Sequence, residues 1–168
     1  MTPGYTIRRA GVGDAATIAR HRVAMFRDMG HVPTEAIAAA LLQASAPALG
    51  ALLQDGAYVG WLALDDSQAV VAGAGAHVKP QLPRVALDGS RIVTEALPLV
   101  VNVYTEPRWR GRGVARALME TLLAWATGEG FDRVVLHASD DGRPLYLSLG
   151  FLPTNEMRWT PADGDAHG

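Results

Sequence analysis

Residues 99–138 constrain the fold more than any other part of the chain. Residues 99–104 form a nearly continuous apolar run, the pattern of a central strand buried on both faces. An amphipathic helix follows and stops at Gly128, with apolar residues at Val114, Leu118, Leu122 and Trp125. Residues 133–138 then predict a second strand. Strand, helix and strand at this length predict a βαβ unit with two parallel strands.

The flanking sequence predicts further strands and helices, so the fold class is mixed α/β. Before the βαβ unit we expect a strand over 5–10, a helix from 14 to 30, two short helices over 34–53 separated at Pro47, a hairpin over 57–64 and 69–78, and a long connection over 79–98 with some strand near 91–94. After it we expect a short helix ending at Leu149 and a last strand over 151–159.

Composition excludes several classes of function. The 168 residues fit one domain, and a net charge of −2 gives no overall field for nucleic acid or anionic lipid. The sequence has 0 cysteines, which excludes disulfides, a thiolate zinc site and a thiol nucleophile. Residues 1–10 lack the apolar segment of a signal peptide, and the longest apolar runs look too short for a bilayer. We therefore expect a cytoplasmic protein with no nucleic-acid or membrane partner.

A glycine-rich turn over 110–115 lies between the apolar strand and the amphipathic helix. Its glycines allow close backbone approach, and the free amides of a helix start attract an anion such as a diphosphate. A Walker A loop is excluded because the only lysine is Lys79, and a dinucleotide fingerprint because Arg116 stands where its third glycine belongs. As a glycine turn alone, this segment is equally compatible with a solvated loop.

The wider context of this turn resembles the GNAT acetyltransferase superfamily. Arg110, Gly113 and Ala115 match its Arg/Gln-x-x-Gly-x-Gly/Ala motif. Upstream, 103–107 looks like the end of that family's fourth strand, and downstream 138–151 looks like its closing motif. The order of elements also agrees over nearly the whole chain.

The resemblance implies a single GNAT-like domain over 1–160, with a flexible tail over 161–168. Its sheet would be central and mostly antiparallel, with a parallel, splayed pair of strands that admits the pantetheine arm of acetyl-CoA. The residues that would contact acetyl-CoA are Val103, Tyr104, Thr105, Arg110, Gly111, Arg112, Gly113, Val114, Ala115 and Ser139. A backbone amide near Val103 would polarise the acetyl carbonyl.

The resemblance also suggests catalytic residues for direct attack of an amine on the thioester. Tyr146 lies where many family members have a tyrosine that protonates the departing thiolate, although it could instead pack with its helical neighbours. Glu106 and Glu95 are candidate bases, and either could be an ordinary loop charge. Asn102 could orient a water or the amine.

The acceptor side remains open. By resemblance it maps to the first two helices and the middle strands, that is to Met25, Phe26, Met29, His31 and Trp61, the first three of which also fit a core. Arg20, Arg22 and Arg27 could serve an anionic acceptor or be a solvated helix face. We expect no metal site, a small-molecule or peptide amine as acceptor, and possible homodimerisation. The alternative function is a non-catalytic acyl-CoA-binding sensor.

Overall fold

The structure, a computed structural model, describes residues 4–162. The chain divides after His137 into two compact units. The division predicted from sequence, a domain over 1–160 and a tail over 161–168, stays a prediction. Residues 163–168 of that tail lie outside the described residues.

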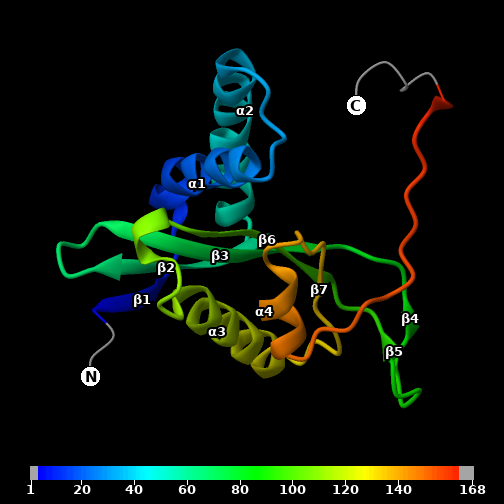
Figure 1. The fold of residues 1–168 in the computed structure, drawn as a ribbon. Helices are drawn as coiled ribbons and strands as arrows, with labels where there is room; N and C mark the ends of the chain where they lie inside the picture. The colour runs from blue at the N-terminus through cyan, green and yellow to red at the C-terminus, as the bar shows by residue number, and fades with distance from the viewer. Residues whose placement is uncertain (1–3, 163–168) are drawn as a thin grey trace. The chain divides into compact units, whose positions relative to one another are not determined.

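A five-stranded sheet forms the first unit (Figure 1). Its order is β1 (Tyr5–Arg9), β2 (Tyr58–Asp65), β3 (Val70–Lys79), β6 (Leu97–Thr105) and β7 (Val135–Leu136). All neighbours are antiparallel except β6 and β7, which are parallel. This confirms the mixed α/β fold class and the predicted parallel pair.

The prediction that β6 is the central strand is wrong. The central strand is β3, and β6 lies between it and the short β7. Burial along β6 alternates between buried and half-buried residues, because successive side chains point to opposite faces of the sheet. An apolar run thus indicated a strand that is buried on one face and only partly covered on the other.

Helices cover both faces of this sheet (Figure 1). A short 3-10 turn, Val12–Asp14, leads into α1 (Ala15–Asp28), which packs with α2 (Glu35–Gln54) on one face. A core cluster joins these helices to β2 through Ile18, Leu49, Tyr58, Leu62 and Leu64. On the opposite face α3 (Val114–Gly128) buries Leu118, Met119 and Leu122 completely. This packing fixes α3, and with it the turn that precedes α3.

Helix α2 is continuous, so the predicted break at Pro47 is wrong. Proline removes one backbone N–H, and the carbonyl of Gln43 loses its partner. Both residues are exposed, so water can satisfy that carbonyl. Helix α2 has 20 residues, and an 18-residue window within it has a mean hydropathy of 1.8, so it is long and apolar enough to cross a membrane by length and composition. The expectation that every apolar run is too short is therefore wrong, although a helix of a soluble domain passes the same test.

The long connection between β3 and β6 contains a small hairpin of β4 (Arg84–Val85) and β5 (Ile92–Val93). Sequence periodicity indicated only the second of these strands. Arg84 anchors the hairpin to the segment before β7, because its Nη1 donates to Oδ2 of Asp132 at 2.8 Å. Both side chains are mostly buried, with 20% and 15% of their surfaces exposed.

This ion pair should make stability depend on acid pH. Hydrogen bonds from the Arg84 guanidinium lower the pKa of Asp132 to about 2. An unfolded aspartate has a pKa of about 3.9, so the pair stabilises the fold above that pH and stops doing so as pH falls through 2. Asp132→Asn should lower the thermal midpoint at neutral pH, and the gap to wild type should close in strong acid. A gap in the melting curves that is equal at both pH values would contradict this.

The second unit contains α4 (Arg143–Ser148), close to the helix predicted there. The predicted last strand over 151–159 is wrong, because residues 151–161 contain neither helix nor strand. Pro153 cannot donate to a strand ladder. The large apolar side chains of this segment are also exposed, by 81% at Leu152, 93% at Met157 and 83% at Trp159.

Candidate active site

A β-bulge interrupts the pairing of β3 with β6. Gly73 pairs with Tyr104 and Gly75 with Val101, so Asn102 and Val103 together lie opposite one residue, Ala74. Asn102 has a φ of +58°, in the left-handed region that non-glycine residues rarely adopt. A bulge of this kind takes a backbone group out of the strand ladder. The bulge therefore leaves a polar backbone group on β6 free for a ligand.

The outer edge of β6 opens just before the bulge. Strand β7 pairs with β6 only at Leu99 with Val135 and Val100 with Leu136. Residues 101–105 of β6 have no strand partner on that edge within residues 4–162. This open edge is the feature expected of a splayed parallel pair, and it supplies main-chain donors and acceptors for an extended ligand.

The glycine-rich turn follows the open edge. After a 3-10 turn, Pro107–Trp109, Gly111 and Gly113 adopt φ values of +73° and +78°, and Gly113 is the residue that caps α3. A Cβ atom at either glycine would meet nothing within 4 Å, so the backbone is open to an approaching group. The N–H groups of 111–115 make no hydrogen bond within residues 4–162. Together they form an anion cradle at the start of α3.

Arg110 holds this cradle in place. Its Nη2 lies 2.6 Å from Oδ2 of Asp28 at the end of α1, and its Nε donates to the carbonyl of Thr105 at 2.9 Å. The guanidinium also lies 5.6 Å from the centre of the Tyr104 ring. The turn is therefore fixed to both α1 and the end of β6. Arg112 forms no ion pair with a carboxylate among residues 4–162, and its guanidinium lies 4.9 Å from the centre of the Trp109 ring.

An open hollow of about 440 Å³ lies between α1 and the end of β6, lined in part by Arg20, His21, Tyr104 and Glu106. His21 is 5% exposed, and its Nε2 lies 3.5 Å from Oε1 of Glu106. Its ring contacts Tyr104, with centroids 4.9 Å apart. Burial lowers the pKa of His21, so the ring is neutral at neutral pH. The structure thus pairs the candidate base Glu106 with His21, a partner for which linear spacing gave no signal.

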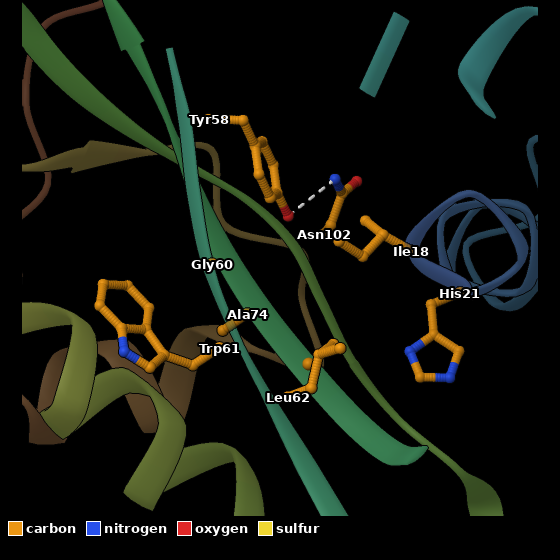
Figure 2. A pocket seen from close by; sticks show the side chains of 9 residues that line it. Ile18, His21, Tyr58, Gly60, Trp61, Leu62, Ala74 and Asn102 are labelled. Atoms are coloured by element: carbon orange, nitrogen blue, oxygen red, sulfur yellow. Dashed lines mark hydrogen bonds between the residues drawn. The ribbon is translucent and has the colours of Figure 1, made fainter. Parts of the chain in front are cut away.

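Asn102 belongs to a buried network beside a small cavity, shown in Figure 2. Its Oδ1 accepts from Nη1 of Arg22 at 2.8 Å, and its Nδ2 donates to the hydroxyl of Tyr58 at 3.3 Å. Asn102 is 4% exposed, and burial raises the pKa of Tyr58 to about 12. The side chain predicted to orient a water or amine is thus held by protein partners. The side chain of Asn102 therefore holds the bulge in place. Arg22 supplies the positive charge in this network.

The other residues predicted for the acceptor site or for catalysis lie in different parts of the first unit. Trp61 lies on the opposite side of the sheet from His21, toward α3 (Figure 2), and its ring lies 5.7 Å from that of Trp125. The structure therefore excludes Trp61 from the face covered by the first two helices. His31 contacts Phe26, and Glu95 pairs with Arg91 at 2.9 Å. No group of three or more metal-ligating side chains occurs in the part of the chain that the structure describes.

Ser139 and Tyr146 lie in the second unit. The hydroxyl of Ser139 accepts from the N–H of Gly142 at 3.2 Å. A Cβ at Gly142 would lie 2.8 Å from the Tyr146 ring, so only glycine permits this approach. Tyr146 also packs edge-on against Phe151, and burial raises the pKa of its hydroxyl. Tyr146 therefore carries its proton at neutral pH, and its predicted role, like that of Ser139, stays a prediction.

Comparison with known proteins identifies similar chains. A family model described as the acetyltransferase (GNAT) family matches residues 25–151. A crystal structure of a GCN5-related N-acetyltransferase from Ralstonia eutropha JMP134 is 32% identical, with a TM-score of 0.82 over 95% of this chain and 99% of that one. A predicted acetyltransferase from Clostridium acetobutylicum, crystallised with acetyl-CoA, is 25% identical, with a TM-score of 0.78 over 97% and 99% of the two chains.

A curated protein also matches part of the chain. The glucosamine 6-phosphate N-acetyltransferase of Trypanosoma brucei brucei is 29% identical over 82 residues, or 49% of this chain. The matched stretch spans half of the length of that relative.

Proposed function

Because the chain belongs to the acetyltransferase (GNAT) family, we propose that it transfers an acetyl group from acetyl-CoA to a primary amine by direct attack on the thioester. The observation that carries this proposal is the continuity of the open edge of β6 with the anion cradle at the start of α3. An extended arm that ends in a diphosphate fits that arrangement.

The cradle suits the diphosphate of acetyl-CoA. The N–H groups of 111–115 point from a helix start, where the helix dipole favours negative charge. No side chain obstructs Gly111 or Gly113, so the diphosphate can approach the backbone. The main chain of Val103, Tyr104 and Thr105 would bind the pantetheine arm along the open edge. The Tyr104 ring packs against His21, so only its backbone serves this arm.

The bulge supplies the electrostatic part of catalysis. The backbone N–H near Val103 would donate to the acetyl carbonyl, where negative charge grows as the amine attacks. The network of Asn102 with Arg22 and Tyr58 holds this backbone rigid. Positioned donors of this kind stabilise the transition state without rearranging during the reaction.

Three proton transfers complete the reaction. The amine nitrogen forms a bond to the acetyl carbon, the carbon–sulfur bond breaks, and two protons leave the nitrogen of an initially protonated amine. We assign acceptance of one proton to Glu106, which meets the amine through water because it lies three residues beyond Val103, about 10 Å along an extended strand. Tyr146 delivers its proton to the departing thiolate, which leaves as a thiol, and the second amine proton passes through water to the tyrosinate that remains.

The experiment that tests this function is thiol release from acetyl-CoA with pooled amines. The protein has 0 cysteines and contributes no background thiol. We expect release that depends on a pool of small amines or on a peptide amine. Binding of acetyl-CoA with no release above spontaneous hydrolysis in any pool would instead indicate the non-catalytic sensor.

A further inference from the structure

Helix α1 carries three arginines whose surroundings differ. Arg27 pairs with Glu35 at 2.6 Å, and Arg20 is exposed and donates to the hydroxyl of Thr17. Arg22 has no carboxylate partner within residues 4–162, yet it is half-buried. Among residues 4–162, every other arginine that lacks a carboxylate partner is exposed. Arg22 is therefore not simply part of a solvated helix face.

The contacts of Arg22 are all with neutral groups. Its Nη1 donates to Oδ1 of Asn102 at 2.8 Å, and its guanidinium lies 4.9 Å from the centre of the Phe26 ring one turn along α1. These contacts fix the plane of the guanidinium but compensate none of its charge. A guanidinium has five N–H donors, so most remain open. A buried donor without a partner would be costly, and no Arg22 nitrogen is such a donor within residues 4–162. The open donors of Arg22 therefore face solvent.

A partly desolvated cation with open donors and a fixed orientation is suited to an anion. Removing a charge from water is costly unless an opposite charge approaches, and a guanidinium fork matches both carboxylate and phosphate. The position also matters, because Asn102 is the bulge residue and adjoins Val103. An anion on Arg22 would thus lie one asparagine side chain from the proposed reacting centre.

We infer that Arg22 binds an anionic group on the acceptor, so that the acceptor is an amine that carries a carboxylate or a phosphate. The anion would anchor the acceptor between α1 and β6, with its nitrogen beside the bulge. Arg22 is then a specificity-determining residue as well as the support of Asn102. This inference rests on the proposed function and names the class of its acceptor.

The test compares matched acceptors that differ only in the anionic group. Alanine is paired with alaninamide, and glucosamine 6-phosphate with glucosamine, at saturating acetyl-CoA. In wild type, kcat/KM should be at least about 10-fold higher for the anionic member of one pair than for its neutral member. The pair that shows this difference identifies the anion as a carboxylate or a phosphate. Arg22→Met should lower kcat/KM for the anionic member of that pair by about 10- to 100-fold more than for the neutral one, with this extra loss in KM, while any loss through the Asn102 contact falls equally on both members. Arg22→Lys, which keeps the charge but not the fork, should fall between them.

The control variant is Arg27→Met, which removes a surface ion pair from the same helix and should leave both acceptors unchanged. An equal loss for both members of each pair, seen in kcat, would show that Arg22 only supports Asn102 and would overturn the inference. A wild-type enzyme that prefers the neutral members would do the same.

A binding measurement decides the inference even if no amine is acetylated. Inorganic phosphate and acetate are titrated into the protein with saturating coenzyme A, which covers the anion cradle at 111–115. One of them should raise the melting temperature of wild type and Arg27→Met but not of Arg22→Met. Absence of any shift in wild type, or an equal shift in Arg22→Met, would overturn the anion site. Absence of turnover with every amine would overturn the proposed function alone.

Discussion

Tyr146→Phe should lower kcat by at least about 100-fold while leaving the KM for acetyl-CoA within about twofold of wild type. The variant removes one hydroxyl and keeps the ring that packs against Phe151 and Gly142. Because burial raises the pKa of Tyr146, the phenol is protonated at neutral pH and can supply a proton to the thiolate. Initial rates of thiol release, measured over a range of acetyl-CoA concentrations, separate the two parameters.

Tyr5→Phe is the matched control, since it removes a hydroxyl from the first strand, where the ring of Tyr5 contacts Trp109. It should leave kcat unchanged. If Tyr146→Phe retains full turnover, Tyr146 is a packing residue and the thiolate receives its proton from another group.

Leu118→Ala should lower the free energy of unfolding by about 2–5 kcal/mol. Leu118 is fully buried on the face of α3 that packs on the sheet, so truncation leaves a cavity that the neighbouring Met119 and Leu122 cannot fill. Since α3 begins at Gly113, loosening of this helix should also weaken binding of acetyl-CoA. Urea unfolding followed by far-UV circular dichroism measures the first effect, and calorimetric titration with coenzyme A the second.

Glu120→Ala on the same helix is the control, because Glu120 is exposed and pairs only loosely with Arg116 at 3.6 Å. Its unfolding free energy should stay within about 0.5 kcal/mol of wild type. A Leu118→Ala protein as stable as this control would show that the α3 packing described here does not hold the fold together.

The sequence predicted those parts of the fold that depend on local patterns of residues. The spacing of Val114, Leu118 and Leu122 indicated α3 because burial of a helix face repeats every three to four residues. The turn over 110–115 could be recognised because φ values like those of Gly111 and Gly113 require glycine. The succession of strand, helix and strand over 99–138 predicted the parallel pair, which the register of β6 and β7 confirms.

The parts that sequence missed depend on tertiary contacts. An apolar run shows that β6 is buried but not how many strands lie beside it, so its place in the sheet was wrong. Pro47 is tolerated in α2 because it is exposed, which local propensity does not reveal. The pairing of His21 with Glu106 and of Arg22 with Asn102 joins α1 to β6 and the residue after it, across about half of the chain. No spacing rule brings such residues together.

Mass spectrometry of the acceptor shows whether acetyl passes from acetyl-CoA to an amine nitrogen. The protein is incubated with acetyl-CoA that carries an isotopically labelled acetyl group and with the amine pool that supports thiol release. We predict labelled acetyl in an amide bond on the acceptor, formed in step with free coenzyme A and strongly reduced in Tyr146→Phe. Labelled free acetate with no acetylated amine would overturn the proposed function, because the chain would then be a thioester hydrolase.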